Sequence, residues 1–250
     1  MVICFISDTH CQHSAKKLKY YLDRILEKYP DSTIVHCGDI SSRGRFSEVE
    51  DFLSWYSSLG FTNKIMIPGN HDFFFDYDRA AITDMGKMRH GNPIYSKQDV
   101  DALLLKYPDV IYLNDSGVII DNINFWGSPI TPWFHDWAFN RTEENIANHW
   151  ELIPKNTDIL ITHGPPRGIL DLTYNGYINV GCLELAKKTM DLENLMVHAF
   201  GHIHEGFGIE IIGGKTYINA SFLNFNYQPM NYPVIFDTEE KKSYIFSDLD

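Results

Sequence analysis

The sequence predicts an α/β fold that begins with parallel strands, and three observations lead to this prediction. Short apolar runs such as Val2–Ile6 do not alternate with polar residues, as expected for strands buried on both faces. Between these runs, apolar residues recur at three- and four-residue spacing, which is typical of amphipathic helices. The resulting order of strand, helix, strand, helix, strand requires parallel strands covered by helices. The elements expected here are strands at Val2–Ile6, 33–37 and 64–67 and helices at 15–28 and 47–59.

The pattern after Asp72 is looser but continues to the end of the chain. Gly-Gly, Pro and charged residues separate the last apolar runs, which is typical of short antiparallel strands. We expect a second sheet, built from the C-terminal half, that packs against the first. There are no internal repeats or long linkers, so one domain over residues 1–250 is the simplest organisation. Helices are expected at 79–88, 100–106, 141–151 and 181–192, and strands at 110–113, 118–120, 124–126, 158–162, 196–200, 207–212, 215–218, 234–236 and 243–246.

Composition limits the function. The chain has 250 residues, 44% of them hydrophobic, and a formal net charge of −12. Nucleic-acid polymers are bound through clustered Lys and Arg, so this charge argues against them as partners. A small phosphorylated substrate stays open, because bound cations can invert the local field. The four cysteines have no paired spacing and no apolar run approaches the roughly 18 residues that span a bilayer, so we expect a cytoplasmic protein without membrane contact.

Asp, Asn or His residues, whose side chains can bind metal ions, follow five of the expected strands. Carboxyl ends of parallel strands meet at one edge of a sheet, where ligands bind in open α/β folds. Carboxylates, amide oxygens and imidazoles suit Mn, Fe, Zn, Co or Ni, and spacing such as Asp8-x-His10 can turn two ligands toward one point. The sequence therefore predicts a metal site. Its candidate ligands are Asp8, His10, Asp39, Asn70, His163, His202 and His204.

Two ions about 3.5–4 Å apart serve in-line displacement at phosphorus especially well, since they lower the pKa of a bound water and neutralise phosphate charge. Asp39 is a candidate to give one oxygen to each ion. His71 follows the candidate ligand Asn70 but is not itself needed as a ligand. We expect it to donate a proton or hydrogen bond to the leaving oxygen, with Asp72 orienting and polarising its ring.

This ordered set resembles the calcineurin-like metallophosphoesterase superfamily over residues 8 to 204. Further motifs are similar to its metallophosphoesterase domain-containing branch, which lies near the class III cyclic nucleotide phosphodiesterases. The resemblance implies a four-layer αββα sandwich, with two packed mixed β-sheets flanked by helices, and hydrolysis of phosphodiesters at a dinuclear site. The motifs that resemble the superfamily are Asp8-x-His10, Gly38-Asp39, Gly69-Asn70-His71-Asp72, His163 and Gly201-His202-x-His204. Those similar to the branch are residues 161–166, 179–182, 200–206 and 218–221.

Carried over by position, the resemblance gives each ion four ligands and makes Asp39 the bridge between them. His71 becomes the proton donor or transition-state stabiliser. Some members of the branch replace the residue that matches His202, but here it is present, so we expect full metal occupancy and turnover. One ion would be held by Asp8, His10, Asp39 and His204, and the other by Asp39, Asn70, His163 and His202.

The stretch from Gly38 to Gly44 partly resembles the signature of protein phosphatases, in which an Arg grips the phosphate. Ser42 replaces the Asp of that signature, and Asp72 stands where those phosphatases have Glu. A protein phosphatase is therefore disfavoured, and Arg43 is kept as a candidate phosphate contact.

The function expected is that of a cytoplasmic phosphodiesterase with two divalent ions, Mn first, that hydrolyses a small phosphodiester, a cyclic nucleotide or related nucleotide, by attack of a metal-activated hydroxide. A phosphomonoesterase on the same site and a non-catalytic protein-binding scaffold are the alternatives, and both a monomer and a homodimer stay open. His36 and His198 are interpreted as structural. The aromatic loop 129–140 could stack on a nucleobase or pack internally, and packing is favoured. Its aromatic residues are Trp133, Phe134, His135, Trp137 and Phe139.

Overall fold

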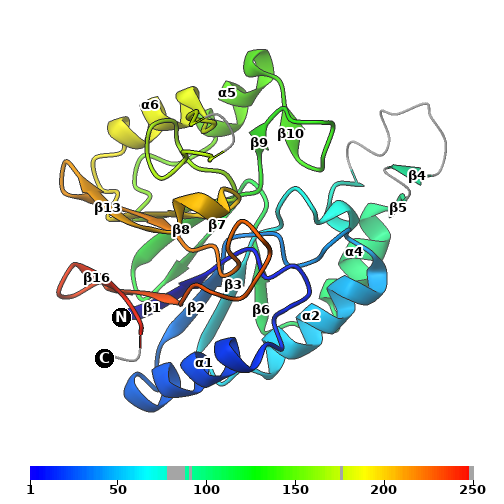
Figure 1. The fold of residues 1–250 in the computed structure, drawn as a ribbon, viewed down its shortest axis with the longest axis horizontal. Coiled ribbons are helices and arrows are strands. Elements are labelled where there is room, and N and C mark those ends of the chain that lie inside the picture. Colours follow the sequence, from blue (N-terminus) through cyan, green and yellow to red (C-terminus); the bar gives the residue numbers. More distant parts are fainter. Residues whose placement is uncertain (78–87, 90–91, 175–176, 248–250) are drawn as a thin grey trace.

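Two six-stranded mixed sheets lie face to face in the computed structural model, and helices cover the outer face of each sheet (Figure 1). The structure describes residues 1–77, 88–89, 92–174 and 177–247. This is the four-layer αββα sandwich that the family resemblance implies. None of the helices in the described ranges is long and apolar enough to span a bilayer.

The first sheet has the order β16-β15-β1-β2-β3-β6. Four of its strands, β1, β2, β3 and β6, are parallel. Beyond β1, β15 pairs antiparallel with β1 and β16 pairs antiparallel with β15. Helices α1, α2 and α4 lie on its outer side (Figure 1). The strands are β1 (Val2–Ile6), β2 (Thr33–His36), β3 (Asn63–Met66), β6 (Val110–Tyr112), β15 (Val234–Asp237) and β16 (Lys242–Ile245), and the helices are α1 (Lys16–Lys28), α2 (Phe46–Ser58) and α4 (Lys97–Leu104).

The second sheet has the order β13-β14-β12-β11-β8-β7 and is covered by α5 and α6 (Figure 1). Its four central strands are parallel, and the edge strands β13 and β7 are antiparallel to their neighbours. Its elements are β7 (Ser116–Ile120), β8 (Ile123–Ser128), β11 (Ile159–Thr162), β12 (Val197–Phe200), β13 (Gly208–Ile212), β14 (Lys215–Asn219), α5 (Glu143–Glu151) and α6 (Leu183–Asp191). The remaining short elements are β4 (Met88–Arg89), β5 (Asn92–Pro93), β9 (Thr131–Pro132), β10 (Asn140–Arg141) and the 3₁₀ helices Phe73–Phe75 and His204–Gly206.

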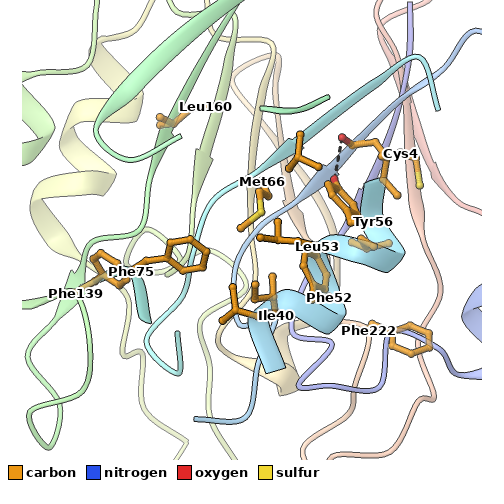
Figure 2. Packing of buried hydrophobic residues seen from close by; sticks show 14 of the residues in the cluster. Cys4, Ile40, Phe52, Leu53, Tyr56, Met66, Phe75, Phe139, Leu160 and Phe222 are labelled. Carbon is orange, nitrogen blue, oxygen red and sulfur yellow. Dashed lines mark hydrogen bonds between the residues drawn. The ribbon is translucent and has the colours of Figure 1, made fainter. Parts of the chain in front are cut away.

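Strand β1 shows why its sequence does not alternate. Ile3 and Phe5 belong to the cluster between the two sheets, whereas Cys4 and Ile6 belong to the cluster under the helices, and all four are buried. Figure 2 shows the helix side of this packing, where Phe52, Leu53 and Tyr56 of α2 lie over the first sheet. Both faces of the strand are therefore apolar, as its sequence predicts.

The C-terminal strands differ in part from the prediction. β13 and β14 form the expected antiparallel pair in the second sheet, but β15 and β16 return to the first sheet, where β15 pairs with β1. A short apolar run fits the edge of either sheet, so its sequence does not specify the partner. The helix expected at 79–88 falls mostly outside the described residues, and its last residue, Met88, belongs to β4.

Candidate active site

The structure brings all the candidate metal ligands together at the carboxyl ends of five strands. Each lies directly after its strand or within the following turn, and the strands come from both sheets. Asp8 and His204, 196 positions apart in sequence, thus meet at one edge of the sandwich. Asp8 and His10 follow β1, Asp39 follows β2, Asn70 follows β3, His163 follows β11, and His202 and His204 follow β12.

The ligand atoms form two groups with Asp39 between them. Its Oδ2 lies 3.6 Å from His10 Nε2 and 3.4 Å from His163 Nε2. On the His10 side, ligand atoms of Asp8, His10 and His204 all lie within 4.8 Å of one another, and on the His163 side the same holds for Asp39, His163 and His202. The spacing fits two neighbouring cation sites that share one carboxylate.

His10 gives an independent test of whether cations fit here. Its side chain is 3% exposed, and neither ring nitrogen has a hydrogen-bond partner in the structure. Burial lowers the pKa of His10 to about 4, although Asp39 opposes the shift, so the ring is neutral near pH 7 and offers a lone pair. A buried imidazole without partners is costly, and a bound divalent ion would satisfy it.

Hydrogen bonds from neighbouring loops orient the other ligands. His163 Nδ1 lies 2.9 Å from the Cys37 carbonyl oxygen, and His204 Nδ1 lies 3.0 Å from that of Asn224. A carbonyl only accepts hydrogen bonds, so each Nδ1 carries a proton. Each Nε2 faces other candidate ligands: that of His163 lies 2.9 Å from Asn70 Oδ1, and that of His204 lies 3.4 Å from Asp8 Oδ1. Asp8 is held from two sides by the Ser221 hydroxyl, at 2.9 Å, and the backbone N–H of His202, at 3.0 Å.

Charge and backbone geometry also concentrate at these residues. Burial opposes ionisation of Asp39, but His163 and His71 outweigh it and hold the pKa of this carboxyl well below its usual value. Asp8, His10, Asp39 and His202 all have left-handed backbones, with φ of 54°, 40°, 55° and 67°. Non-glycine residues seldom adopt this conformation, and such strain gathers at functional sites.

Glycine is required where the backbone passes the carboxylates. A Cβ atom on Gly201 would overlap the Asp8 carboxylate and the Ser7 hydroxyl, and one on Gly69 would overlap the Asp39 carboxylate. The glycines of the sequence motifs therefore make room for the ligands.

His71 is fixed by four contacts. Its backbone N–H donates to Asp39 Oδ1 at 2.8 Å, and its Nδ1 lies 2.8 Å from the Ser42 carbonyl oxygen. Its ring stacks on Trp137, with centroids 4.3 Å apart, and meets His10 edge-on at 4.6 Å. The carbonyl again assigns the proton to Nδ1, so Nε2 is the atom left for chemistry. A nitrogen of His71 also lies within 4.8 Å of ligand atoms of His10 and Asp39.

The prediction that Asp72 orients and polarises the ring of His71 is wrong. Asp72 is fully buried and accepts hydrogen bonds from the Gly69 N–H at 2.7 Å and from the Ser41 N–H and hydroxyl at 2.9 and 2.6 Å. Burial and the charge of Asp39 raise the pKa of Asp72 to about 6, although the Ser41 hydroxyl opposes the shift. Asp72 thus ties the loop after β2 to the loop after β3, and the Ser42 carbonyl orients His71.

A cavity of about 520 Å³ opens over the candidate ligands. Arg43, the candidate phosphate contact, is exposed and does not line it. The aromatic loop divides between the two expectations, because Trp133, Phe134 and Trp137 line the cavity whereas Phe139 is buried in the core.

Tyr227 also lines the cavity, and sequence reasoning missed it. It meets the rings of His10 and His204 edge-on, with both centroid separations 5.1 Å. The carbonyl of Asn224, which orients His204, belongs to the same segment. Their sequence signal is weak: a polar and aromatic stretch between two strands, without a ligand motif.

Carboxylates, an amide and imidazoles gather at one edge of a sandwich of two mixed sheets. This arrangement is typical of metal-dependent hydrolases. The family model described as calcineurin-like phosphoesterase matches residues 1–206, and the chain belongs to that family. The family uses divalent metals in phosphoester hydrolysis, which agrees with the clustered ligands.

Two relatives in sequence are informative. Metallophosphoesterase domain-containing protein 1 of Homo sapiens is 39% identical over 240 residues, which cover 93% of this chain and 69% of that protein. UPF0046 protein T07D4.2 of Caenorhabditis elegans is 33% identical over 218 residues, which cover 83% of this chain and 54% of that protein.

Two solved structures share the fold at low sequence identity. Phosphopantetheinyl hydrolase of Mycobacterium tuberculosis has a TM-score of 0.53 at 16% identity, with 88% of each chain covered. An archaeal phosphodiesterase has a TM-score of 0.51 at 17% identity, with 98% of each chain covered.

Proposed function

We propose that the chain is a phosphodiesterase with two divalent ions, Mn first, that acts on a small phosphodiester such as a cyclic nucleotide or a related nucleotide. The observation that carries the proposal is the position of Asp39, whose one carboxylate lies within 3.6 Å of ligand nitrogens on both sides. We assign Asp8, His10, Asp39 and His204 to one ion and Asp39, Asn70, His163 and His202 to the other.

When bound, the two ions would supply an activated water and neutralise charge on the phosphate oxygens. The chain supplies the rest of the chemistry. Asp8 and Asp39 bring negative charge, and the backbone contacts that fix them hold the ligands in register. His71 keeps its Nδ1 proton on the Ser42 carbonyl and, when both ring nitrogens are protonated, donates the Nε2 proton to the leaving oxygen, which leaves a neutral ring.

The charge of the cavity favours a diester over a substrate with more phosphate charge. Among the described residues that line it, none is Lys or Arg, and the cationic candidate Arg43 lies outside. A diester carries one negative charge at neutral pH, whereas a phosphomonoester carries nearly two. We therefore expect the site to accept a diester, with one charge to neutralise, more readily than a monoester.

The test compares two substrates with the same leaving group. Protein loaded with Mn is assayed with bis(4-nitrophenyl) phosphate and with 4-nitrophenyl phosphate, and EDTA-treated protein is the control. We expect higher kcat/KM for the diester and loss of both activities without metal. A strong preference for the monoester would reject the proposal. A panel of 2′,3′- and 3′,5′-cyclic nucleotides then identifies the substrate.

The thiols support our proposal for the compartment. All four cysteines are free, three of them buried, which fits a reducing environment. We therefore place the proposed activity in the cytoplasm.

A further inference from the structure

The loop between β9 and β10 holds two aromatic side chains at the wall of the cavity. Trp133 is 52% exposed and Phe134 is 59% exposed, although both line the cavity over the candidate metal site. Ala138 and Phe139 of the same loop are buried. Large aromatic side chains held half in water beside a cavity are typical of a binding surface.

Buried hydrogen bonds fix the loop that carries them. Asn140 is 3% exposed, and its Oδ1 accepts from the backbone N–H of Phe134 at 3.0 Å and of Trp137 at 3.1 Å. The backbone N–H of Ala138 donates to the carbonyl oxygen of Asn70 at 3.2 Å. The loop is thus tied directly to a candidate ligand, so the positions of its aromatic residues are set relative to the metal site.

A row of rings joins this wall to the opposite end of the site. Successive centroids of Trp137, His71, His10 and Tyr227 are 4.3, 4.6 and 5.1 Å apart. The two histidines of the row belong to the proposed chemistry, whereas Trp137 and Tyr227 are the aromatic residues at its ends. A phosphate held over the histidines would therefore have flat apolar surfaces within reach.

We propose that Trp133 and Phe134 form a stacking subsite for the base of a nucleotide diester, an inference that rests on the proposed function and specifies its substrate class. The cavity has a volume suited to one small ligand. Stacking uses the π-face that every base has, so the subsite selects for a base without selecting one base over another. Substrates that lack a planar ring lose this interaction.

The experiment uses two diesters that differ in the base alone. One is the cyclic nucleotide that the Mn-loaded protein turns over fastest, and the other is the same ribose cyclic phosphate with O-methyl in place of the base. We expect Trp133→Ala or Phe134→Ala to lower kcat/KM for the cyclic nucleotide roughly 5- to 150-fold, the range for loss of one stacking aromatic residue. The value for the base-free diester should change less than about twofold, since the stacking interaction is absent from it.

Three further variants separate stacking from other effects. Trp133→Phe keeps a flat ring and should retain most of the preference, whereas Trp133→Leu keeps apolar bulk without a π-face and should lose it. Tyr20→Ala removes a side chain that is 50% exposed on α1 and serves as the matched control. Calorimetric titration with AMP and with ribose 5-phosphate gives a readout that does not depend on turnover.

The outcomes distinguish this inference from the proposed function. Equal kcat/KM for the two diesters in the unchanged protein, equal losses for both in Trp133→Ala, or full preference in Trp133→Leu would each overturn the subsite while phosphodiester hydrolysis stands. If the unchanged protein hydrolyses monoesters but no diester, the proposed function fails. The subsite then stands or falls on whether AMP binds more tightly than ribose 5-phosphate and loses that advantage in Trp133→Ala.

Discussion

Replacing His71 tests whether this residue transfers a proton or binds a metal. The ring can be removed without disturbing the contact to the shared carboxylate, because the bond to Asp39 is made by the backbone N–H of His71. His71→Ala therefore leaves this N–H in place, and His71→Gln also keeps a polar side chain. We expect both variants to bind as much metal as the unchanged protein.

The expected loss of rate follows from the role of Nε2. Proton transfer by a positioned side chain contributes roughly 10²–10⁴-fold, so kcat for a cyclic nucleotide should fall by that factor. An alkoxide needs a proton to leave, whereas 4-nitrophenolate is a stable anion. The loss with bis(4-nitrophenyl) phosphate should therefore be much smaller than the loss with the cyclic nucleotide.

The assay combines metal analysis by mass spectrometry with kcat for both substrates at saturating Mn. Tyr20→Ala is the control, because Tyr20 is exposed on α1 and does not line the cavity. If His71→Ala loses bound metal, the residue is a ligand and the assignment of proton donor is wrong. Equal losses on the two substrates would also refute proton transfer to the leaving group.

Three other changes probe the site and its support. Asp39→Ala should abolish turnover and lower the metal content measured by mass spectrometry, because one carboxylate serves both proposed ions. Gly201→Ala should weaken Mn binding, followed by titration calorimetry, since its Cβ would overlap the Asp8 carboxylate. Burial lowers the pKa of His198 to about 3 from about 6.5 in the unfolded chain. Below about pH 6.5 the unfolded state therefore binds a proton that the folded state does not, so the free energy of unfolding should decrease as the pH is lowered from about 6.5 toward 3. In urea denaturation, the free energy of unfolding of His198→Phe should decrease less over the same pH range.

The fold could be predicted where a local pattern determines burial. In β1 the apolar residues run without interruption because both faces are covered, and in β2 and β3 the consecutive pairs Ile34-Val35 and Ile65-Met66 each place one residue on either face. The intervening helices show an apolar stripe. The destination of β15 could not be predicted in this way. β15 pairs antiparallel with residues 2–5 of β1, at the opposite end of the chain. A run of four residues has no local property that specifies such a partner.

The candidate ligands could be found because each follows a strand whose end the sequence marks. The neighbouring buried histidines show the limit of residue type alone. His36 and His198 each place Nε2 against a threonine hydroxyl, at 3.0 Å from Thr9 and 2.7 Å from Thr162. They lie within strands and not beyond them, so position relative to the strand end separates these histidines from the candidate ligands.

The contacts around the ligands could not be read from adjacency. Asp72 follows His71 in sequence, which suggests that the two side chains interact. In the structure the chain turns here, with the Asp72 N–H donating to the Gly69 carbonyl at 3.0 Å, and the Asp72 carboxylate points into the buried loop junction while the His71 ring lines the cavity. Consecutive side chains in a tight turn diverge, so neighbours in sequence seldom share a function through direct contact. The partner of His71 is the backbone carbonyl of Ser42, which every residue type has. The sequence therefore does not indicate this partner, and only the folded structure identifies it.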